Sequence, residues 1–599
     1  MTDTASKPQP GGLRATLRTD LLAALAVVAF AILLGASDGF SRLSDAKGDN
    51  DSLLRLVEVR DLLAGQGWFD PFQYRMGPDG GFAMHWSRLV DAPIAAIVLV
   101  AGWATGSQEL GESAARVLWP SLLLGVGTLL VARAARIAYG PEAAFPALVV
   151  GALGLVSIGV FQAGAIDHHN VQLVLTLGMG LGLLGGGFGA AVLAGACTAL
   201  TLAIGMETLP YVAVGGAIAA GLLLFRGERE RATAAGFGLG FAAVAAAAFV
   251  ATIPPGRWGQ PACDAYSVAQ ASVAVLAGLG LAAAATLGRL ADTVSRRLIA
   301  LGLLGAAVAA LLVLAFPHCL ADPYAGLDPR LKRFWLDGIT EAQPVFEIAA
   351  KDPAMLLTWY ATPLLGLIVV AATIARSGIR RVDAIVGTLL LATFLVSVWQ
   401  VRGAVFAVAL ATIPLSGWIA RRRAAASRSP SRAATLALAA AWILSFNAVW
   451  SAAGDRIFAP SLPSDASVTV ASAGACYRSD DYAALAALPA ATVLSVSNLG
   501  SAILAWTPSR ALAGSYHRNV EGNLSALDML MATTAEAEDR IRAGKVGIVA
   551  VCPGNSETTL LAEAAPDGLL AALNRGAVPA WLEPIGGGPA LRLYRVRPD

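Results

Sequence analysis

The chain has 599 residues, of which 56% are hydrophobic and only 14% are charged, and its formal net charge is +2. Soluble proteins carry about 25% charged residues, so this composition and the mean hydropathy of +0.64 exclude an ordinary soluble protein. A net charge near zero argues neither for nor against nucleic acid. The basic residues occur in short clusters between long uncharged stretches, which indicates membrane topology rather than a nucleic-acid surface, and we expect no nucleic-acid partner.

The first apolar run follows a short polar N-terminus, residues 1–17. No cleavage pattern of a signal peptide stands close behind this run, so we interpret it as an uncleaved first span. Apolar runs of sufficient length predict about thirteen spans in all. We place them at residues 18–36, 115–136, 143–162, 169–187, 188–206, 209–225, 233–252, 269–288, 297–316, 354–375, 382–398, 403–420 and 433–452.

The run at residues 92–106 is short for a span and resembles an interfacial segment in length. The distribution of basic residues decides whether this run crosses the membrane or lies at its surface. If this run does not cross, the basic loops all lie on the side of the basic N-terminus, and if it crosses they all lie outside. The positive-inside rule therefore favours an interfacial segment. The loops concerned are ARAARIAYG, FRGERERAT, GRLADTVSRR, ARSGIRR and ARRRAAASRSPSR.

This topology predicts three parts of the chain. Residues 1–17 form a cytoplasmic N-terminus, and residues 18–452 form a transmembrane domain with external loops at 37–114 and 317–353. Residues 453–599 form an external tail, long enough to fold by itself. Strand-like runs (ATVLSVS, VGIVAVC, ALRLYRV) alternate there with helical stretches, which predicts a small α/β domain.

The histidines and most cysteines gather on the external side. All five histidines lie outside the membrane or at its outer edge, and so do four of the five cysteines. An even number of external cysteines suits an oxidising compartment. We pair Cys263 with Cys319 and Cys476 with Cys552, because each pair lies within one region; four free thiols are the alternative.

The strongest chemical motif is GAIDHHN, residues 164–170, at the external end of a predicted span. An acid and two imidazoles are costly at a membrane boundary unless they bind something. Asp167 and His169 can face one point from an irregular segment and offer an oxygen and a nitrogen to one divalent ion. The alternative is a polar end to a membrane helix, and His168 is a further candidate.

The other charged residues, each taken alone, are weaker candidates for a functional site. Asp49 and Asp51 precede a helix-like run, so either can be its N-cap instead of a ligand. Glu341 lies in the long external loop, where a single Glu is usually solvated. Glu207 lies between two apolar runs near the outer surface, where an acid is a functional candidate. Arg402 stands alone between two spans, and its planar fork suits phosphate, although it can also extend to lipid headgroups.

The order of these motifs resembles the oligosaccharyltransferase catalytic-subunit family, especially its archaeal and bacterial single-subunit members. The stretch GDNDSLLRLVEVRDLLAGQGWFDPFQYRMGPDGGFAMHWSRLVDAPIA resembles the first external loop of that family, and His85 lies in its HW-plus-proline segment. GAIDHHN resembles the second acidic motif, and GITEAQP resembles the third. Arg402 lies where the family keeps an arginine for the donor pyrophosphate. The resemblance covers nearly the whole chain.

The resemblance implies a GT-C fold and an inverting glycosyl transfer from a polyprenyl-linked sugar donor. It implies a divalent metal, Mg²⁺ or Mn²⁺, with Asp51, Asp167 and His169 as ligands. Asp51 would also orient the acceptor, with Asp49 as the competitor for its role, and Glu341 would complete the site. Arg402 would bind the donor phosphate.

One departure concerns the acceptor. Family members that glycosylate asparagine carry a Trp-Trp-Asp signature, and the corresponding place here is VSNLG, residues 496–500, without either tryptophan or the acid. Tyr516, His517 and Arg518 follow it and are candidates for a different acceptor or donor contact, or for a structural role.

The sequence therefore predicts a polytopic glycosyltransferase of the bacterial inner membrane, with a periplasmic C-terminal domain. Its partners would be membrane lipids, a polyprenyl-linked donor and a glycan, lipid or protein acceptor. A true oligosaccharyltransferase that modifies asparagine is the nearest rival. A transporter or flippase for lipid-linked sugars is the rival of another class, but such proteins tend to show internal repeats and mid-membrane charges, whereas these acids gather on one face.

Overall fold

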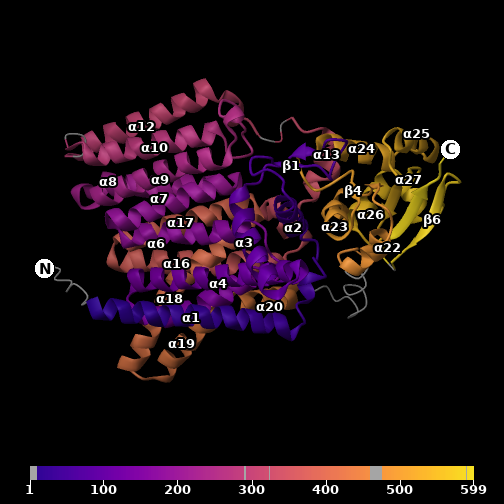
Figure 1. Ribbon diagram of the computed structural model, residues 1–599. Helices are drawn as coiled ribbons and strands as arrows, with labels where there is room; N and C mark the ends of the chain where they lie inside the picture. The colour runs from indigo at the N-terminus through magenta and orange to yellow at the C-terminus, as the bar shows by residue number, and fades with distance from the viewer. Residues whose placement is uncertain are drawn as a thin grey trace.

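The computed structural model describes residues 10–288, 292–322, 324, 326–458, 475–588 and 590–598, and for residues 10–17 the backbone only. Residues 1–9 of the predicted cytoplasmic N-terminus and residues 459–474 of the predicted C-terminal domain lie outside this part of the chain. The described residues form a bundle of helices with a smaller α/β part at one end (Figure 1).

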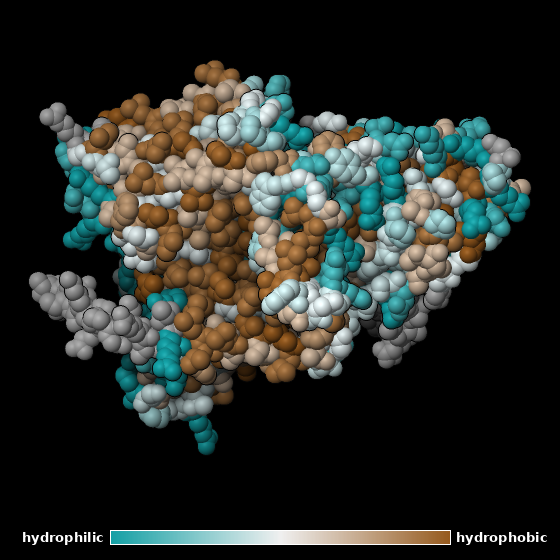
Figure 2. Space-filling model, in the orientation of Figure 1, coloured by the Kyte–Doolittle hydropathy of each residue, from teal (hydrophilic) through white to brown (hydrophobic). Residues whose placement is uncertain are grey.

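The bundle is built from apolar helices, because in lipid the backbone polar groups of a span must bond within the segment. Exposed leucines and other large apolar side chains cover it, and Figure 2 shows this brown surface over the bundle and mostly teal polar residues over the C-terminal part. Its helices are α1 (Pro10–Ser37), α4 (Gln108–Tyr139), α5 (Ala144–Ser157), α6 (His169–Gly185), α7 (Gly187–Ile204), α8 (Leu209–Arg226), α9 (Arg231–Thr252), α10 (Val268–Thr286), α12 (Val294–Ala315), α16 (Thr362–Ser377), α17 (Arg381–Trp399), α18 (Ala404–Arg428), α19 (Arg432–Ser445) and α20 (Asn447–Phe458).

The polytopic helical fold is confirmed. Ten helical segments among the described residues are long and apolar enough to cross a membrane, or eleven if the bent pair α19–α20 is one span. Each of the thirteen expected spans nevertheless overlaps a helix of the bundle, or the helix pair α19–α20. The helices α5 and α6 have only 14 and 17 residues, and the segment 206–252 counts α8 and α9 together. The pair α19–α20, predicted as one span, bends by 78°.

The run at residues 92–106 lies in α3 (Arg88–Thr105), which has 18 residues and satisfies the same length criterion. The side chain of Ser87 caps this helix. Gly106 follows it with φ +69°, a conformation that favours glycine, and turns the chain into α4, against which α3 packs. Length alone therefore does not separate a span from an interfacial helix, and the interfacial placement stays a prediction.

The segments predicted to be external, called external loops below, contribute short elements. The first loop contains α2 (Asn50–Leu63), α3 and a small hairpin of β1 (Phe72–Gln73) with β2 (Phe82–Ala83). The long loop before α16 contains α13 (Pro329–Phe334), α14 (Val345–Lys351) and α15 (Ala354–Leu356).

The C-terminal part contains a five-stranded mixed sheet in the order β4-β3-β5-β7-β6. Strand β3 runs parallel to β4 and β5, and β7 runs antiparallel to β5 and β6. The predicted α/β composition is thereby confirmed. Its elements are α22 (Ala483–Ala486), β3 (Thr492–Leu494), α23 (Gly500–Trp506), β4 (Arg510–Ala511), α24 (Val520–Leu530), α25 (Thr534–Ala543), β5 (Ile548–Val551), α26 (Ser556–Ala564), α27 (Leu569–Asn574), β6 (Leu582–Gly587) and β7 (Arg592–Val596).

The first external loop and the C-terminal part share one hydrophobic core. Leu54 and Val57 of α2 and Met76 of the same loop are buried in one cluster with Ile503 and the strands of the sheet. The side chain of Arg60 reaches across to donate to the carbonyl of Ala505 at 2.6 Å. This shared burial fixes α2 against α23 of the C-terminal part.

Two disulfides cross-link the chain, in the expected pairing. Cys263 is bonded to Cys319, which joins the loop after α9 to the loop after α12. Cys476 is bonded to Cys552, which joins the beginning of the described C-terminal part to the end of β5. Cys197, in α7, is a free thiol.

Replacing both Cys476 and Cys552 by alanine is expected to lower the free energy of unfolding of the C-terminal part by about 2–4 kcal/mol, because the bond closes a long loop of the unfolded chain. The two residues are 76 positions apart. Thermal unfolding of the purified protein measures the effect, with Cys197→Ala as a control that removes no cross-link. An unchanged transition, or free thiols at both positions in the native protein, would contradict the pairing.

Candidate active site between the bundle and the C-terminal domain

The first acidic pair lies at the beginning of α2, and its two members differ in their surroundings. The Asp49 carboxylate is the N-cap and accepts the backbone N–H of Ser52 at 2.9 Å. Acidic side chains are favoured at this position because the first N–H groups of a helix lack partners. Asp51, in the first turn, is free of this capping bond and accepts the hydroxyl of Tyr516 at 3.2 Å. The competition between the two acids therefore favours Asp51 as the functional group.

The Asp-His-His segment forms the turn between α5 and α6. Its backbone is fixed to α2, because the hydroxyl of Ser52 accepts the N–H of Ile166 at 3.0 Å and that of Asp167 at 3.3 Å. Asn170 closes the turn by donating to the carbonyl of Ala165 at 2.9 Å. One serine thus holds together two motifs that lie far apart in the sequence.

The two histidines of this segment have different partners. His168 is buried, and both of its ring nitrogens contact acidic side chains. Nδ1 contacts Asp167, and Nε2 lies 2.7 Å from Glu207. His169, the first residue of α6, places Nε2 at 3.5 Å from Asp167. Ligand atoms of Asp167 and both histidines lie within 4.8 Å of one another. Since His168 is engaged at both nitrogens, Asp167 and His169 are the better pair for a metal, and Glu207 orients His168.

The charges around Asp51 and Asp167 suit a divalent cation. Burial, together with the neighbouring carboxylates of Asp167 and Glu341, raises the pKa of Asp51 to about 7. Burial also opposes ionisation of Asp167, but His168 and His169 outweigh it and hold the pKa of Asp167 well below its usual range. Carboxylates that repel one another ionise together when a cation lies between them. Oxygen and imidazole ligands fit Mg²⁺ or Mn²⁺, or a softer ion such as zinc.

A third acid and an arginine approach the same place from the last part of the bundle. Glu341 lies in a short 3-10 turn, Thr340–Ala342, and its carboxylate is 3.6 Å from the guanidinium of Arg402. The backbone N–H of Val401 donates to the carbonyl of Gln343 at 3.0 Å and joins the two turns. The Nε atom of Arg402 is buried and has no hydrogen-bond partner within the described residues. An arginine with an unused donor suits an anionic ligand.

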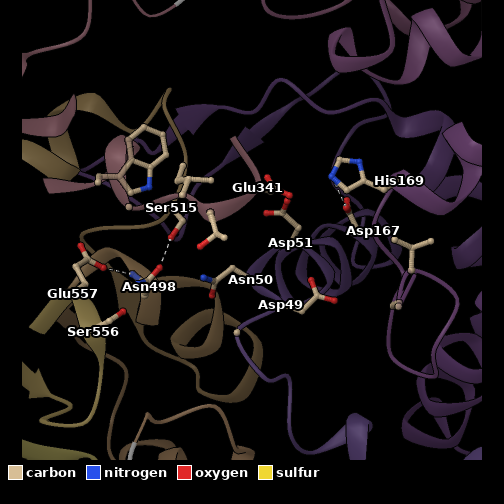
Figure 3. Close-up of a pocket in the computed structure, with 18 of the residues that line it drawn as sticks. Asp49, Asn50, Asp51, Asp167, His169, Glu341, Asn498, Ser515, Ser556 and Glu557 are labelled. Atoms are coloured by element: carbon tan, nitrogen blue, oxygen red, sulfur yellow. Dashed lines mark hydrogen bonds and ion pairs between the residues drawn. The ribbon is translucent and has the colours of Figure 1, made fainter. Parts of the chain in front are cut away.

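A cavity of about 800 Å³ brings Asp51, Asp167, His169 and Glu341 together, whereas Arg402, His168 and Glu207 lie outside its lining. This volume suits a bound small molecule. Figure 3 shows Asp51, Asp167 and Glu341 on one side, and Asn498, Ser515 and Glu557 of the C-terminal part on the other. Its lining residues are Gly48, Asp49, Asn50, Asp51, Gly159, Val160, Ala165, Asp167, His169, Asn170, Phe334, Trp335, Gly338, Ile339, Thr340, Glu341, Asn498, Ser515, Ser556, Glu557 and Leu560.

The wall opposite the acids was not predicted as a site. The buried carboxylate of Glu557 accepts the backbone N–H and hydroxyl of Ser497, both at 3.0 Å, and the N–H of Asn498 at 2.9 Å. Ser515 in turn donates to Asn498 at 3.3 Å. Ser497 and Glu557 follow β3 and β5, and the carboxyl ends of neighbouring parallel strands commonly carry a ligand site. That topological rule is the signal by which the sequence could have revealed this wall.

Three further candidates, His85, His517 and Arg518, lie outside the lining of this cavity. Arg518 holds Asp264 with two bonds of 2.7 Å, and Nε2 of His517 lies 2.7 Å from the same carboxylate. The ring of His85 packs against that of His517, with centroids 4.6 Å apart. Asp264 is next to Cys263, so this cluster fastens the C-terminal part to a disulfide-braced loop of the bundle.

Glu557→Ala is expected to lower the free energy of unfolding of the C-terminal part by about 2–4 kcal/mol, because three donors lose their acceptor inside the protein. The exposed Glu563, on the same helix α26, gives the matched control, since its replacement by alanine should change stability by no more than about 0.5 kcal/mol. Chemical denaturation followed by tryptophan fluorescence separates the two. Equal stability of both variants would show that this carboxylate does not build the wall.

No protein-family model matches the chain, and no curated protein matches it. Solved structures do match. The oligosaccharyltransferase of Archaeoglobus fulgidus, tethered with an acceptor peptide containing the NVT sequon, is 15% identical and has a TM-score of 0.64, covering 96% of this chain and 74% of that chain. The AglB structure from the same organism, in complex with an inhibitory peptide and a dolichol-phosphate, is 14% identical with a TM-score of 0.63, covering 92% and 72%.

A further structure of the Archaeoglobus fulgidus enzyme, a complex with Zn and sulfate, is 15% identical with a TM-score of 0.57, covering 91% of this chain and 70% of that chain. At such low identity the likeness shows the fold. The resemblance found in the motifs is thereby confirmed at that level: this chain has the GT-C-like membrane fold of the archaeal oligosaccharyltransferases.

Proposed function

We propose that the protein is a membrane glycosyltransferase that transfers a sugar or oligosaccharide from a polyprenyl-phosphate or polyprenyl-diphosphate donor to an acceptor outside the cytoplasm. The observation that carries the proposal is the single cavity lined by Asp51, Asp167, His169 and Glu341, which come from three distant segments. The archaeal enzyme of the same fold was solved with dolichol-phosphate and with an acceptor peptide, which supports these classes of ligand.

Asp51, Asp167 and His169 are the proposed ligands of a divalent cation, Mg²⁺ or Mn²⁺. Bound there, the ion would offset the negative charge that grows on the leaving phosphate. The orientation of His169 by Gln172, 3.4 Å from Nδ1, leaves Nε2 directed towards Asp167. His168 and Glu207 support the ligands from behind, as outer partners of metal ligands commonly do.

The remaining residues act on the donor and the acceptor directly. Arg402 binds the phosphate of the donor. The departing phosphate keeps the electron pair of its bond to the anomeric carbon, and the guanidinium of Arg402 stabilises the negative charge that results. Asp51 orients the acceptor nucleophile and accepts its proton, a role that contributes typically about 10²–10⁴-fold. Glu341 closes the site between them. Attack from the face opposite the departing phosphate inverts the anomeric configuration.

The acceptor of this transfer is a glycan, a lipid or a protein. The segment at residues 496–500 has no Trp-Trp-Asp, and the wall beside it offers the amide of Asn498 and the hydroxyl of Ser515. Such groups bond to hydroxyls without demanding a sequon. Asparagine glycosylation is the second candidate, because the fold matches an enzyme that was solved with a sequon peptide.

The cellular placement belongs to the same proposal. We place the protein in a bacterial inner membrane, with the cavity and the C-terminal domain in the periplasm and residues 1–17 in the cytoplasm. The positive-inside rule supports this orientation. This orientation puts both disulfides in the periplasm, which is an oxidising compartment.

The direct experiment incubates purified protein with a polyprenyl-diphosphate-linked oligosaccharide and either a glycan acceptor or a sequon peptide, and identifies products by mass spectrometry. Transfer to the glycan supports the leading proposal. Transfer to asparagine decides for the rival. Consumption of no donor with any acceptor would count against both.

Asp167→Asn is expected to reduce transfer by about 100-fold or more, because it removes the central charge of the proposed metal site. A chelator should abolish wild-type transfer, and added Mn²⁺ should restore it in the wild type but not in the variant. The exposed Asp567, replaced by asparagine, is the matched control and should leave turnover unchanged. Unimpaired turnover of Asp167→Asn in folded, membrane-inserted protein would remove the metal assignment.

A further inference from the structure

A buried tyrosine of the C-terminal part lies directly against the proposed catalytic acid. The hydroxyl of Tyr516 is 3.2 Å from Oδ1 of Asp51 and 3.2 Å from the carbonyl oxygen of Asn50. It also lies 3.1 Å from the hydroxyl of Ser501. Tyr516 is only 3% exposed. The metal-ligand and phosphate roles proposed above make no use of this group.

The direction of these hydrogen bonds follows from counting protons. The tyrosine hydroxyl has one proton to donate, and neither the Asn50 carbonyl nor an ionised Asp51 can donate in return. Ser501 can donate its own proton to the tyrosine oxygen, which leaves the tyrosine proton for the acid side. A carboxylate is a stronger acceptor than a neutral carbonyl. The chain of donation therefore runs from Ser501 through Tyr516 to Asp51.

The ring of Tyr516 is held independently of its hydroxyl. It packs edge-on against Trp86, with centroids 5.5 Å apart, and stacks on Phe82 at 6.4 Å. A phenylalanine at this position keeps both ring contacts and loses only the hydroxyl. The oxygen can thus be removed without collapse of the surrounding core.

The sequence neighbours of Tyr516 anchor it on the bundle. His517 and Arg518 bind Asp264 in the loop after α9. The same short segment therefore docks the C-terminal part at one point and reaches Asp51 at another. The position of the Asp51 side chain therefore depends on how the C-terminal part docks on the bundle.

We infer that Tyr516 is a positioning residue: its hydroxyl fixes the carboxylate of Asp51 in the orientation that the proposed metal and acceptor require. The inference rests on the proposed function and deepens it. It assigns to the C-terminal domain a direct part in the transfer step, besides a wall of the cavity. Without the hydroxyl, the Asp51 side chain samples other rotamers, and the productive one is populated for less of the time.

The test compares Tyr516→Phe with Tyr482→Phe. Tyr482 is a fully buried tyrosine of the same domain, and its hydroxyl donates to the carbonyl of Cys476 at 3.0 Å. Both variants lose one buried hydroxyl, so their stabilities should fall by amounts of the same order, although the hydroxyl of Tyr516 has three polar neighbours and that of Tyr482 has one. Only Tyr516→Phe removes a contact with Asp51. Ser501→Ala tests the next link of the chain of donation.

Two measurements apply to each variant: kcat and KM for transfer, and the affinity for Mn²⁺ alone by electron paramagnetic resonance. For Tyr516→Phe we expect kcat to fall about tenfold with KM for donor and acceptor unchanged, and Mn²⁺ affinity to fall several-fold. Tyr482→Phe should match the wild type in both, and Ser501→Ala should lie between them.

Wild-type values of kcat and Mn²⁺ affinity in Tyr516→Phe would overturn the inference while the proposed function stands. Equal losses in Tyr516→Phe and Tyr482→Phe would also overturn it, because they would reveal a general loss of stability. Absence of both turnover and Mn²⁺ binding in the wild type would remove the proposed function, and the inference with it.

Discussion

Mutual repulsion of neighbouring carboxylates is the constraint on which the candidate site depends. Asp51, Asp167 and Glu341 line one cavity, and like charges in such surroundings separate unless the chain holds them. The hydroxyl of Ser52 supplies one restraint, since it accepts two backbone N–H groups of the Asp-His-His turn. Asp49 supplies another by capping α2 and fixing its first turn. These neutral and capping contacts hold the acids close together, where a cation between them or protonation of Asp51 relieves their repulsion.

The bundle and the C-terminal domain are packed together and are not two separate modules joined by a hinge. The first external loop contributes Leu54 and Val57 to the same hydrophobic core as the C-terminal sheet. Arg518 and His517 grip Asp264 beside a disulfide. The cavity lies between elements that are thus fixed on both sides, which favours a preformed site over one assembled by a large domain movement. Glu341 is the exception, because it is attached by a short turn and a single ion pair with Arg402.

Sequence analysis predicted the polytopic fold, the α/β tail and both cysteine pairs, because these follow from hydropathy, charge and compartment, which are local or additive properties. It also placed the acids on one side. The thirteen expected spans all overlap helices of the bundle, but α5 and α6 are short and the chain bends between α19 and α20, so ten or eleven segments of the described chain satisfy the length criterion. Length in sequence does not reveal where a helix ends.

The polar wall and the role of Tyr516 lay beyond the sequence for another reason. Asn498, Ser515 and Glu557 acquire meaning only from their partners, which lie up to 60 positions away. No pattern of residue types predicts that Tyr516 would meet Asp51 across 465 positions. By contrast, the Asp-His-His motif carries its chemistry in three adjacent residues. Its position at the end of an apolar run was enough to single it out in the sequence.

The central claim is that one divalent ion lies between the acids of the first external loop and the Asp-His-His turn. Anomalous diffraction from crystals of the full chain soaked with Mn²⁺ tests it most directly. The account predicts one strong peak bonded to Asp51, Asp167 and His169 at distances typical of oxygen and imidazole ligands. Saturating Mn²⁺ with no peak in the cavity, or a peak bonded to none of these three residues, would contradict it.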